Sequence, residues 1–239
     1  MAQHGDRGFV DYNEDFLVTA IGDLPEVDVQ SAAGVTTAIL ANQLGGVVEI
    51  PVATSNDDDV AAVTTNLNWN CGDGGTLIGV ARVKWDTSVA DMMWFIGFGD
   101  SIATSDEVAF SVTGNVYDIA AMSDAIGFVF DNDATNPSVV AVAGKGDALT
   151  YQSRLGGSYT PVVNTYDNFR VEVGPGAVYI EWAINGMVVA STRRAAGDST
   201  SYISTTAPLA MGVWNYEQGT ANEIELDRLY VRKGRADGD

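Results

Sequence analysis

Three carboxylates occupy alternate positions near the end of the chain, in EIELDRLY at residues 223–230: Glu223, Glu225 and Asp227. Alternate side chains of an extended strand share a face, so these acids are expected on one side, with Ile224, Leu226 and Arg228 on the other. A retaining glycosidase needs two carboxyl groups about 5–5.5 Å apart, and alternate residues of one strand can approach that separation. A row of acids is also what the solvated face of any strand presents. Because a catalytic site needs groups that converge from more than one strand, the solvated face is the favoured interpretation.

A second group of oxygen-bearing side chains lies in FDNDATN, residues 130–136, where Asp131, Asp133 and Asn136 have a spacing that Ca²⁺ tolerates. The segment lacks the glycine and the distal glutamate of an EF-hand loop, and Asp and Asn clusters commonly form turns. We therefore predict a turn here, with calcium as the weaker alternative, and no cofactor for the protein.

The sequence lacks the residues that most other kinds of catalytic site need. His4 is the only histidine and Cys71 the only cysteine, so no intrachain disulfide can form. Neither Ser-His-Asp nor Cys-His catalysis is expected, and Cys71 has no zinc partners. The sequence therefore predicts a protein that is not an enzyme.

Five tryptophans could stack on sugars where they are exposed, although tryptophan in a β-sandwich more often fills the core. Trp94 and Trp182 lie in strongly apolar alternating segments and are predicted to be core residues. Trp214, in GVWNYEQG, is the best candidate for an exposed aromatic. Together with Tyr216 it forms the candidate glycan-binding pair.

The charge of the chain is strongly negative, since 32 acidic residues against 12 basic ones give a formal net charge of −20. Such a surface repels nucleic-acid phosphates and anionic lipids, so neither nucleic acid nor a membrane is an expected partner. Near the C-terminus, Arg232, Lys233 and Arg235 form a candidate partner-binding group, with a solvated tail as the alternative. The N-terminus lacks the layout of a signal peptide, and the longest apolar runs are too short to cross a bilayer. These features predict a soluble protein without a recognisable export signal.

Short segments rich in Val, Ile, Phe, Tyr and Trp recur between Gly, Asp, Asn and Ser clusters, which is the pattern of an all-β protein. Asn185-Gly186 predicts a tight hairpin because both central residues must take positive φ, and Gly174-Pro175-Gly176 predicts another turn. We predict an all-β sandwich of two antiparallel sheets packed face to face. The expected strands are residues 47–52, 76–86, 91–99, 107–112, 125–131, 138–144, 147–152, 167–174, 176–184, 187–193, 207–216 and 223–233.

The first sixty residues differ from the rest, because aromatics stand among acids in GFVDYNEDFL. We predict an extended N-terminal arm over residues 1–60, with Phe9, Tyr12 and Phe16 as partner-binding residues and a short helix over 34–44. The sandwich is expected over 61–233, followed by a tail over 234–239.

Several segments together resemble the second half of the concanavalin-A-like jelly rolls, the fold of legume lectins, laminin-G modules and laminarinase-type glycosidases. MMWFIGFGD (92–100) also looks like a typical strand of this group. The resemblance covers roughly residues 60–233 and implies the fold rather than an activity. The segments are AIGFVFDNDAT (125–135), YDNFRVEV (166–173), VYIEWAINGMVVA (178–190), PLAMGVWN (208–215) and IELDRLYV (224–231).

The laminarinase-type enzymes carry a strand signature of the form Glu-x-Asp-x-(x)-Glu. On this resemblance Glu223 stands for the nucleophile, Glu225 for the central Asp and Asp227 for the acid/base Glu. Two of the three positions depart from the signature, and the shorter aspartate would have to recover lost reach. The departures argue against hydrolysis.

GFVDYNEDF near the start, followed by such a domain, resembles structural proteins of tailed-bacteriophage virions, in particular capsid decoration or cement proteins. This resemblance implies a homo-oligomer, such as a trimer, on the outer capsid surface, with the major capsid protein as its partner. We therefore expect a virion structural protein that decorates and stabilises a capsid. The alternative is a carbohydrate-binding module, free or displayed on a virion for adsorption to a host-surface glycan. A laminarinase-type glycosidase is the third hypothesis.

Overall fold

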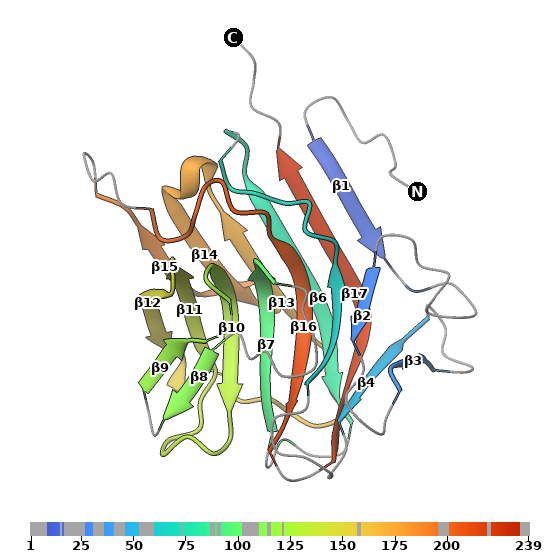
Figure 1. The fold of residues 1–239 in the computed structure, drawn as a ribbon. Coiled ribbons are helices and arrows are strands. Elements are labelled where there is room, and N and C mark those ends of the chain that lie inside the picture. The colour runs from blue at the N-terminus through green and yellow to red at the C-terminus, as the bar shows by residue number, and fades with distance from the viewer. Residues whose placement is uncertain are drawn as a thin grey trace.

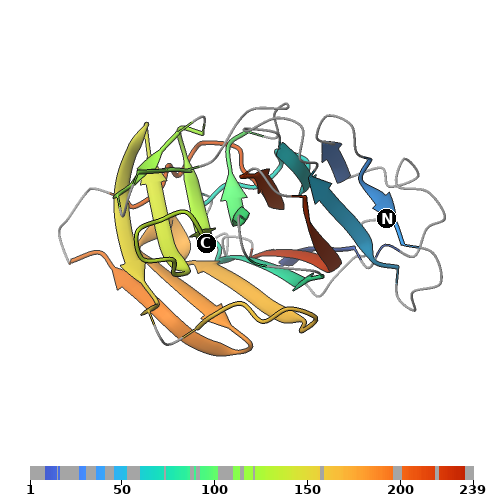
Figure 2. The ribbon, with the colours of Figure 1, turned by 90° about the horizontal axis from the view of Figure 1, so that it is seen from below.

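The computed structural model describes most of the chain, and the strands account for most of the described residues (Figure 1). Two sheets stack as layers, as the two ribbon views show (Figures 1 and 2). Within each sheet, every pairing of described strands is antiparallel, which confirms the predicted all-β sandwich. The described residues are 9–14, 16, 27–30, 36–40, 46–52, 60–72, 74–86, 89, 92–101, 110–113, 116–120, 122–156, 159–195, 201–218 and 221–234.

The eight-stranded sheet has the order β15-β14-β13-β6-β17-β4-β3, and β1 also pairs with β17. Sequence-distant strands meet at its centre, where β17 lies between β6 and β4. The strands are β15 (Met187–Arg193), β14 (Tyr179–Ile184), β13 (Asp167–Val173), β6 (Leu77–Trp85), β17 (Asn222–Gly234), β4 (Val48–Val52), β3 (Ala38–Ile39) and β1 (Phe9–Glu14).

The seven-stranded sheet has the order β12-β11-β10-β7-β16-β5-β2. A separate hairpin, β8 (Phe110–Thr113) with β9 (Val116–Ile119), completes the strands. The members of the sheet are β12 (Ala148–Arg154), β11 (Val140–Lys145), β10 (Ala125–Asp131), β7 (Met92–Gly99), β16 (Ala210–Glu217), β5 (Val60–Thr65) and β2 (Val27–Gln30).

The main core lies between the two sheets and is rich in aromatic rings. Trp85 of β6 and Trp94 of β7 lie 5.5 Å apart between ring centroids, and Phe169 of β13 contacts both edge-on. Trp94 and Trp182 are fully buried, which confirms their predicted place in the core. Contacts of this kind stabilise a sandwich beyond the area that each ring buries.

A second hydrophobic cluster lies on the outer face of the seven-stranded sheet, under the β8–β9 hairpin. Phe95 of β7 contacts Trp214 of β16 at 5.2 Å and Phe110 of β8 at 5.5 Å between ring centroids. Trp214 is 0% exposed and Tyr216 is 2% exposed. The exposure predicted for the candidate glycan-binding pair is therefore wrong, because both rings are buried in this cluster.

The turn predictions are confirmed. Asn185 and Gly186 both have positive φ, 52° and 81°, and they join β14 to β15. The Asn185 side chain also accepts a hydrogen bond from the Asn168 amide and donates one to Asp167. Gly174-Pro175-Gly176 forms the turn between β13 and β14, with a short 3₁₀ segment at Pro175–Ala177. The residues of these two turns therefore determine how β13, β14 and β15 are connected as a meander.

The described part of residues 1–60 is built into both sheets rather than forming a separate arm. β1, β3 and β4 join the eight-stranded sheet, and β2 pairs with β5 in the other. Residue 60 is the first residue of β5, so the expected boundary at 60/61 cuts a strand. Residues 36–40 are extended, so the helix predicted over 34–44 is wrong where the structure describes it.

The aromatic residues of this segment serve the chain's own fold. Phe16 is 0% exposed within the main core, so it cannot be the partner-binding residue that the sequence predicted. Tyr12 is half-buried and packs against the same core. Phe9 begins β1, but its side chain lies outside the described residues.

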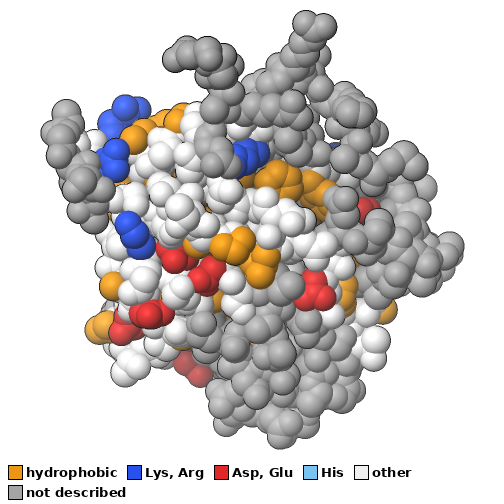
Figure 3. Space-filling model, turned by 45° about the horizontal axis from the view of Figure 1, so that its top comes forward, with side chains coloured by type: hydrophobic (Ala, Val, Ile, Leu, Met, Phe, Trp, Pro, Cys, Tyr) orange, Lys and Arg blue, Asp and Glu red, His pale blue; other side chains and the backbone are white. Residues whose placement is uncertain are grey.

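The surface is mixed in character. On the face seen in Figure 3, basic and acidic side chains are both present, and hydrophobic side chains form small patches among them. Within the described ranges, no helix has the length and apolarity needed to cross a membrane.

Candidate functional site

The outer face of the eight-stranded sheet carries the acids that the sequence singled out. Strand β6 shows how the face is built, because its buried and half-buried residues alternate along its whole length. Gly79 lies against Phe98 and Met211 of the other sheet, so odd-numbered residues point inward. Arg82 and Lys84 therefore point outward, beside the acids of β17.

A β-bulge at Asp227 changes the phase of β17. Leu226 lies opposite Val83 and Arg228 opposite Arg82, so Asp227 is the extra residue between them. Ile224 and Leu226 are buried as predicted, but Arg228 is exposed rather than sharing their inward side. The bulge therefore breaks the simple alternation from which the three-acid row was predicted.

Glu225 is not on a solvated face, which corrects the sequence-based interpretation. Its residue exposure is only 4%, and its carboxylate lies 2.6 Å from the Lys84 ammonium. The Tyr166 hydroxyl, at the start of the segment leading into β13, donates a hydrogen bond of 2.9 Å to the same carboxylate. A buried carboxylate needs such partners, because an unpaired buried charge is strongly destabilising.

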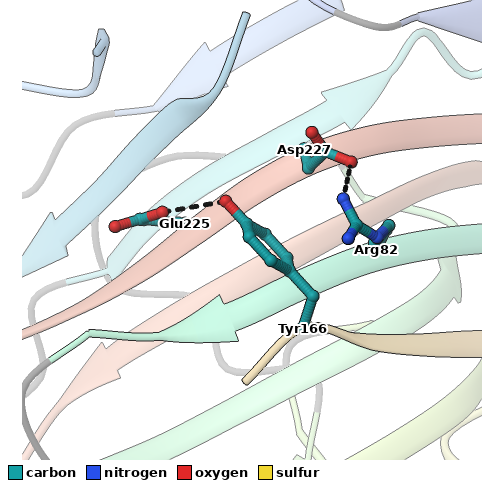
Figure 4. A network of polar contacts seen from close by, with 4 residues as sticks. All are labelled: Arg82, Tyr166, Glu225 and Asp227. Carbon is teal, nitrogen blue, oxygen red and sulfur yellow. Dashed lines mark hydrogen bonds and ion pairs between the residues drawn. The ribbon is translucent and has the colours of Figure 1, made fainter. Parts of the chain in front are cut away.

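Tyr166 also links the two ends of this network (Figure 4). Arg82 lies over the Tyr166 ring, 4.2 Å from its centroid, and pairs with the carboxylate of Asp227. Burial raises the pKa of the Tyr166 hydroxyl, and the hydrogen bond to Glu225 and the neighbouring carboxylates raise it further, so the hydroxyl stays a hydrogen-bond donor. The site is thus formed by side chains from β17, from β6 and from the residue before β13. The sequence analysis did not predict that these three segments meet.

Glu223 has the most altered acidity in the described part of the face. Burial, a hydrogen bond with Glu49 of β4, and the charges of Glu49, Asp86 and Glu225 raise its pKa to about 8. A neutral Glu223 can donate to the Glu49 carboxylate, and this removes one like charge from a crowded group. We call Glu49, Asp86, Glu223 and Glu225 the carboxylate cluster.

Oxygen atoms of Asp86, Glu223 and Glu225 lie within 4.8 Å of one another, a spacing that could hold a cation. Lys84 already supplies a positive charge at this point, since its ammonium lies 2.6 Å from Glu225 and 3.7 Å from Asp86. The residues therefore fit an internal ammonium at least as well as a metal ion.

The candidate calcium segment is a turn. Asp131 is buried, and its Oδ1 accepts hydrogen bonds from the Asp133 amide and from the Gln218 side chain, both at 2.8 Å. Asp133 and Asn136 are exposed. This Asx-type turn explains the acid without a metal.

The basic residues near the C-terminus are only partly described. Arg232 and Lys233 are half-buried on β17, and the Lys233 ammonium donates a hydrogen bond of 2.7 Å to Asn70. Arg235 lies outside the described residues. Their predicted role in partner binding stays a prediction.

No protein-family model and no curated protein sequence matches this chain. Solved structures do match it over nearly its whole length. Basic winged bean lectin with Tn-antigen aligns with a TM-score of 0.61 at 8% sequence identity, covering 96% of this chain and 100% of the lectin. The Bacillus licheniformis beta-glucanase aligns with a TM-score of 0.55 at 12% identity, covering 94% and 98%. A protein of unknown function from Shewanella oneidensis MR-1 aligns with a TM-score of 0.63 at 14% identity, covering 97% and 89%.

Identities this low show a shared fold, so the chain has the concanavalin-A-like jelly-roll fold, as predicted. The same fold serves a lectin and a glucanase, and it is compatible with carbohydrate binding or with carbohydrate hydrolysis. Nothing in these comparisons supports the expected role on a bacteriophage capsid. The virion location and the major capsid protein as partner stay predictions of the sequence.

Proposed function

We propose that this protein binds carbohydrate on the outer face of its eight-stranded sheet. The observation that carries the proposal is the polar network of Lys84, Tyr166, Glu225 and the carboxylate cluster on that face. Sugars are recognised by a few fixed polar groups beside an aromatic or apolar surface, and the network holds such groups in place. The shared fold with a lectin and a glucanase supports the same class of ligand.

The network offers both kinds of hydrogen-bonding group that a sugar hydroxyl needs. A protonated Glu223 is a donor, whereas the half-exposed Asp86 carboxylate is an acceptor. Ion pairs with Lys84 and Arg82 hold two carboxylates in one geometry, which lowers the entropy lost on binding.

A glycan array probed with the full chain tests this proposal. We expect binding that Tyr166→Ala weakens at least about 10-fold, because the ring and its hydroxyl order the network. Tyr151→Ala is the matched control, since Tyr151 stacks on Trp182 at the other end of the sandwich. Absence of binding to every glycan on the array would contradict the proposal.

The second candidate function is a glycosidase, and the raised pKa of Glu223 is the observation that favours it. A general acid must be protonated near the working pH, and an ionised carboxylate must lie close by. Glu223 meets the first condition, and an oxygen of Glu225 lies within 4.8 Å of an oxygen of Glu223, although the Lys84 ion pair weakens Glu225 as a nucleophile. Release of reducing ends from β-glucan, abolished by Glu223→Gln, would establish hydrolysis. Binding without such release would leave a lectin-like protein.

A further inference from the structure

Four arginines gather on the outer face of the eight-stranded sheet, beside the carboxylate cluster. We call Arg82, Arg170, Arg228 and Arg232 the arginine patch. The strand register places them together: Arg228 lies opposite Arg82, and Arg170 lies opposite Val80, which in turn lies opposite Tyr230. Together with Lys84, the arginine patch holds five of the chain's 12 basic residues, in a protein of net charge −20.

The direct opposition of Arg228 and Arg82 needs an explanation. Like charges in directly opposed positions destabilise an antiparallel pair. The Asp227 carboxylate forms an ion pair with Arg82, which offsets the repulsion between Arg82 and Arg228. Glu172 forms an ion pair with Arg170 in the same manner. Arg228 makes no salt bridge with any residue that the structure describes, and it is exposed. Stability of the fold does not account for a cation at this position.

An apolar strip runs between the arginines. Ile78, Val80 and Tyr230 are half-buried on the same outward face, in register with Arg232, Arg170 and Val80. The C–H face of a sugar ring packs on surfaces of this kind, and guanidinium groups bind carboxylates through paired hydrogen bonds. The strip and the patch together match a ring that carries a carboxylate.

We propose that the saccharide bound on this face is acidic, which rests on the proposed function. The Arg228 guanidinium binds the carboxylate of one sugar unit, while the ring lies on Val80 and Tyr230. Arg82 keeps part of its side chain, 37%, open to solvent and adds positive charge beside the carboxylate. The ligand carries isolated carboxylates rather than dense sulfation, because the net charge of −20 repels a polyanion beyond the immediate patch.

Matched pairs of ligands test this inference with the full chain. The probes are sialyllactose against lactose, and oligogalacturonate against its carboxyl-reduced form, with heparin and polyglutamate as polyanion controls. We expect the acidic member of at least one pair to bind at least 10-fold more tightly than its neutral partner. Arg228→Gln should reduce that preference about 10- to 100-fold. Arg228→Lys should restore it only in part, because an ammonium lacks the planar fork.

Arg193→Gln is the matched charge control. Arg193 is exposed on β15 of the same sheet, four strands from β17, a separation of about 19 Å. It should leave the preference intact. Equal affinity for both members of every pair, an unaffected Arg228→Gln variant, or heparin or polyglutamate as the tightest ligand would overturn the inference. Binding of neutral sugars alone would overturn it while the proposed function stands, whereas no glycan binding at all would remove both.

Discussion

The outer faces of the two sheets differ in what holds their side chains in place: apolar packing on one face and ion pairs on the other. The outer face of the seven-stranded sheet is apolar, and Trp214 and Phe95 are fully buried there in one cluster with residues of the β8–β9 hairpin. The outer face of the eight-stranded sheet stays partly open and is held by ion pairs among Lys84, Glu225, Arg82 and Asp227. One face is therefore closed by apolar packing, whereas the other stays accessible around its ion pairs.

Removing an aromatic ring from the covered face should have the largest effect. Trp214→Ala is expected to lower the free energy of unfolding by about 3–5 kcal/mol, because a fully buried ring leaves a cavity. Denaturant unfolding measures the change. Val80→Ala, on the open face, should cost less than about 1.5 kcal/mol. Similar losses for the two variants would mean that the faces do not differ as described.

Breaking the buried ion pair between Lys84 and Glu225 on the open face should cause the second-largest loss of stability. Lys84→Met leaves Glu225 without its cation and is expected to cost about 3 kcal/mol. Adding Glu225→Gln in the same chain should recover much of that loss, since the uncompensated charge disappears. A double-mutant cycle by chemical denaturation gives the coupling. A Lys84→Met variant as stable as the parent protein would contradict this account of the buried Glu225.

The carboxylate cluster should make stability depend on pH. The pKa of Glu223 rises from 4.5 to about 8 on folding, so the folded state holds a proton that the unfolded chain releases. This contribution to stability is fully present below about pH 4.5 and is lost as the pH rises through about 8. The melting temperature of Glu223→Gln should fall less than that of the parent protein across this window. Parallel pH profiles would show that Glu223 keeps an ordinary acidity.

The exposed ion pair should matter least for stability. Arg82→Gln removes the partner of Asp227, but both side chains keep solvent contact, so the expected loss is about 0.5–1 kcal/mol. Thermal unfolding at low and at high salt provides the measurement, because screening should shrink the difference further. A loss as large as that of Lys84→Met would mean that this pair is effectively buried.

Local patterns in the sequence predicted much of the fold. The strand expected at 125–131 has the same bounds as β10, and the hairpin at Asn185-Gly186 takes the positive φ values that its residues favour. β5 was missed, because VAAVTT lacks aromatics and follows a run of acids. The β9 strand was missed as well, since its four residues are too few for a clear alternation.

The candidate site was predicted less well than the fold. Trp214 was expected to be exposed because its neighbours in GVWNYEQG are polar, yet it is buried in one cluster with Phe110, from a hairpin about one hundred residues earlier in the chain. The acids of β17 were identified, but Tyr166 and Lys84 were not linked to them. For Lys84, the only signal in the sequence was its place in the alternation of the expected strand 76–86.

The sequence by itself determined most of the strands of the sandwich, the tight turns and many of the inward-facing residues, because these depend on neighbours within a few positions. Only the tertiary structure decided which outer face is covered and which acids are buried. The bulge at Asp227 and the pairing of β17 with β6 bring Lys84 and Arg82 to the carboxylates, and both arise from contacts between segments some 140 residues apart. Burial and electrostatics depend on such long-range contacts, so the charged row of EIELDRLY became a network only in the folded chain.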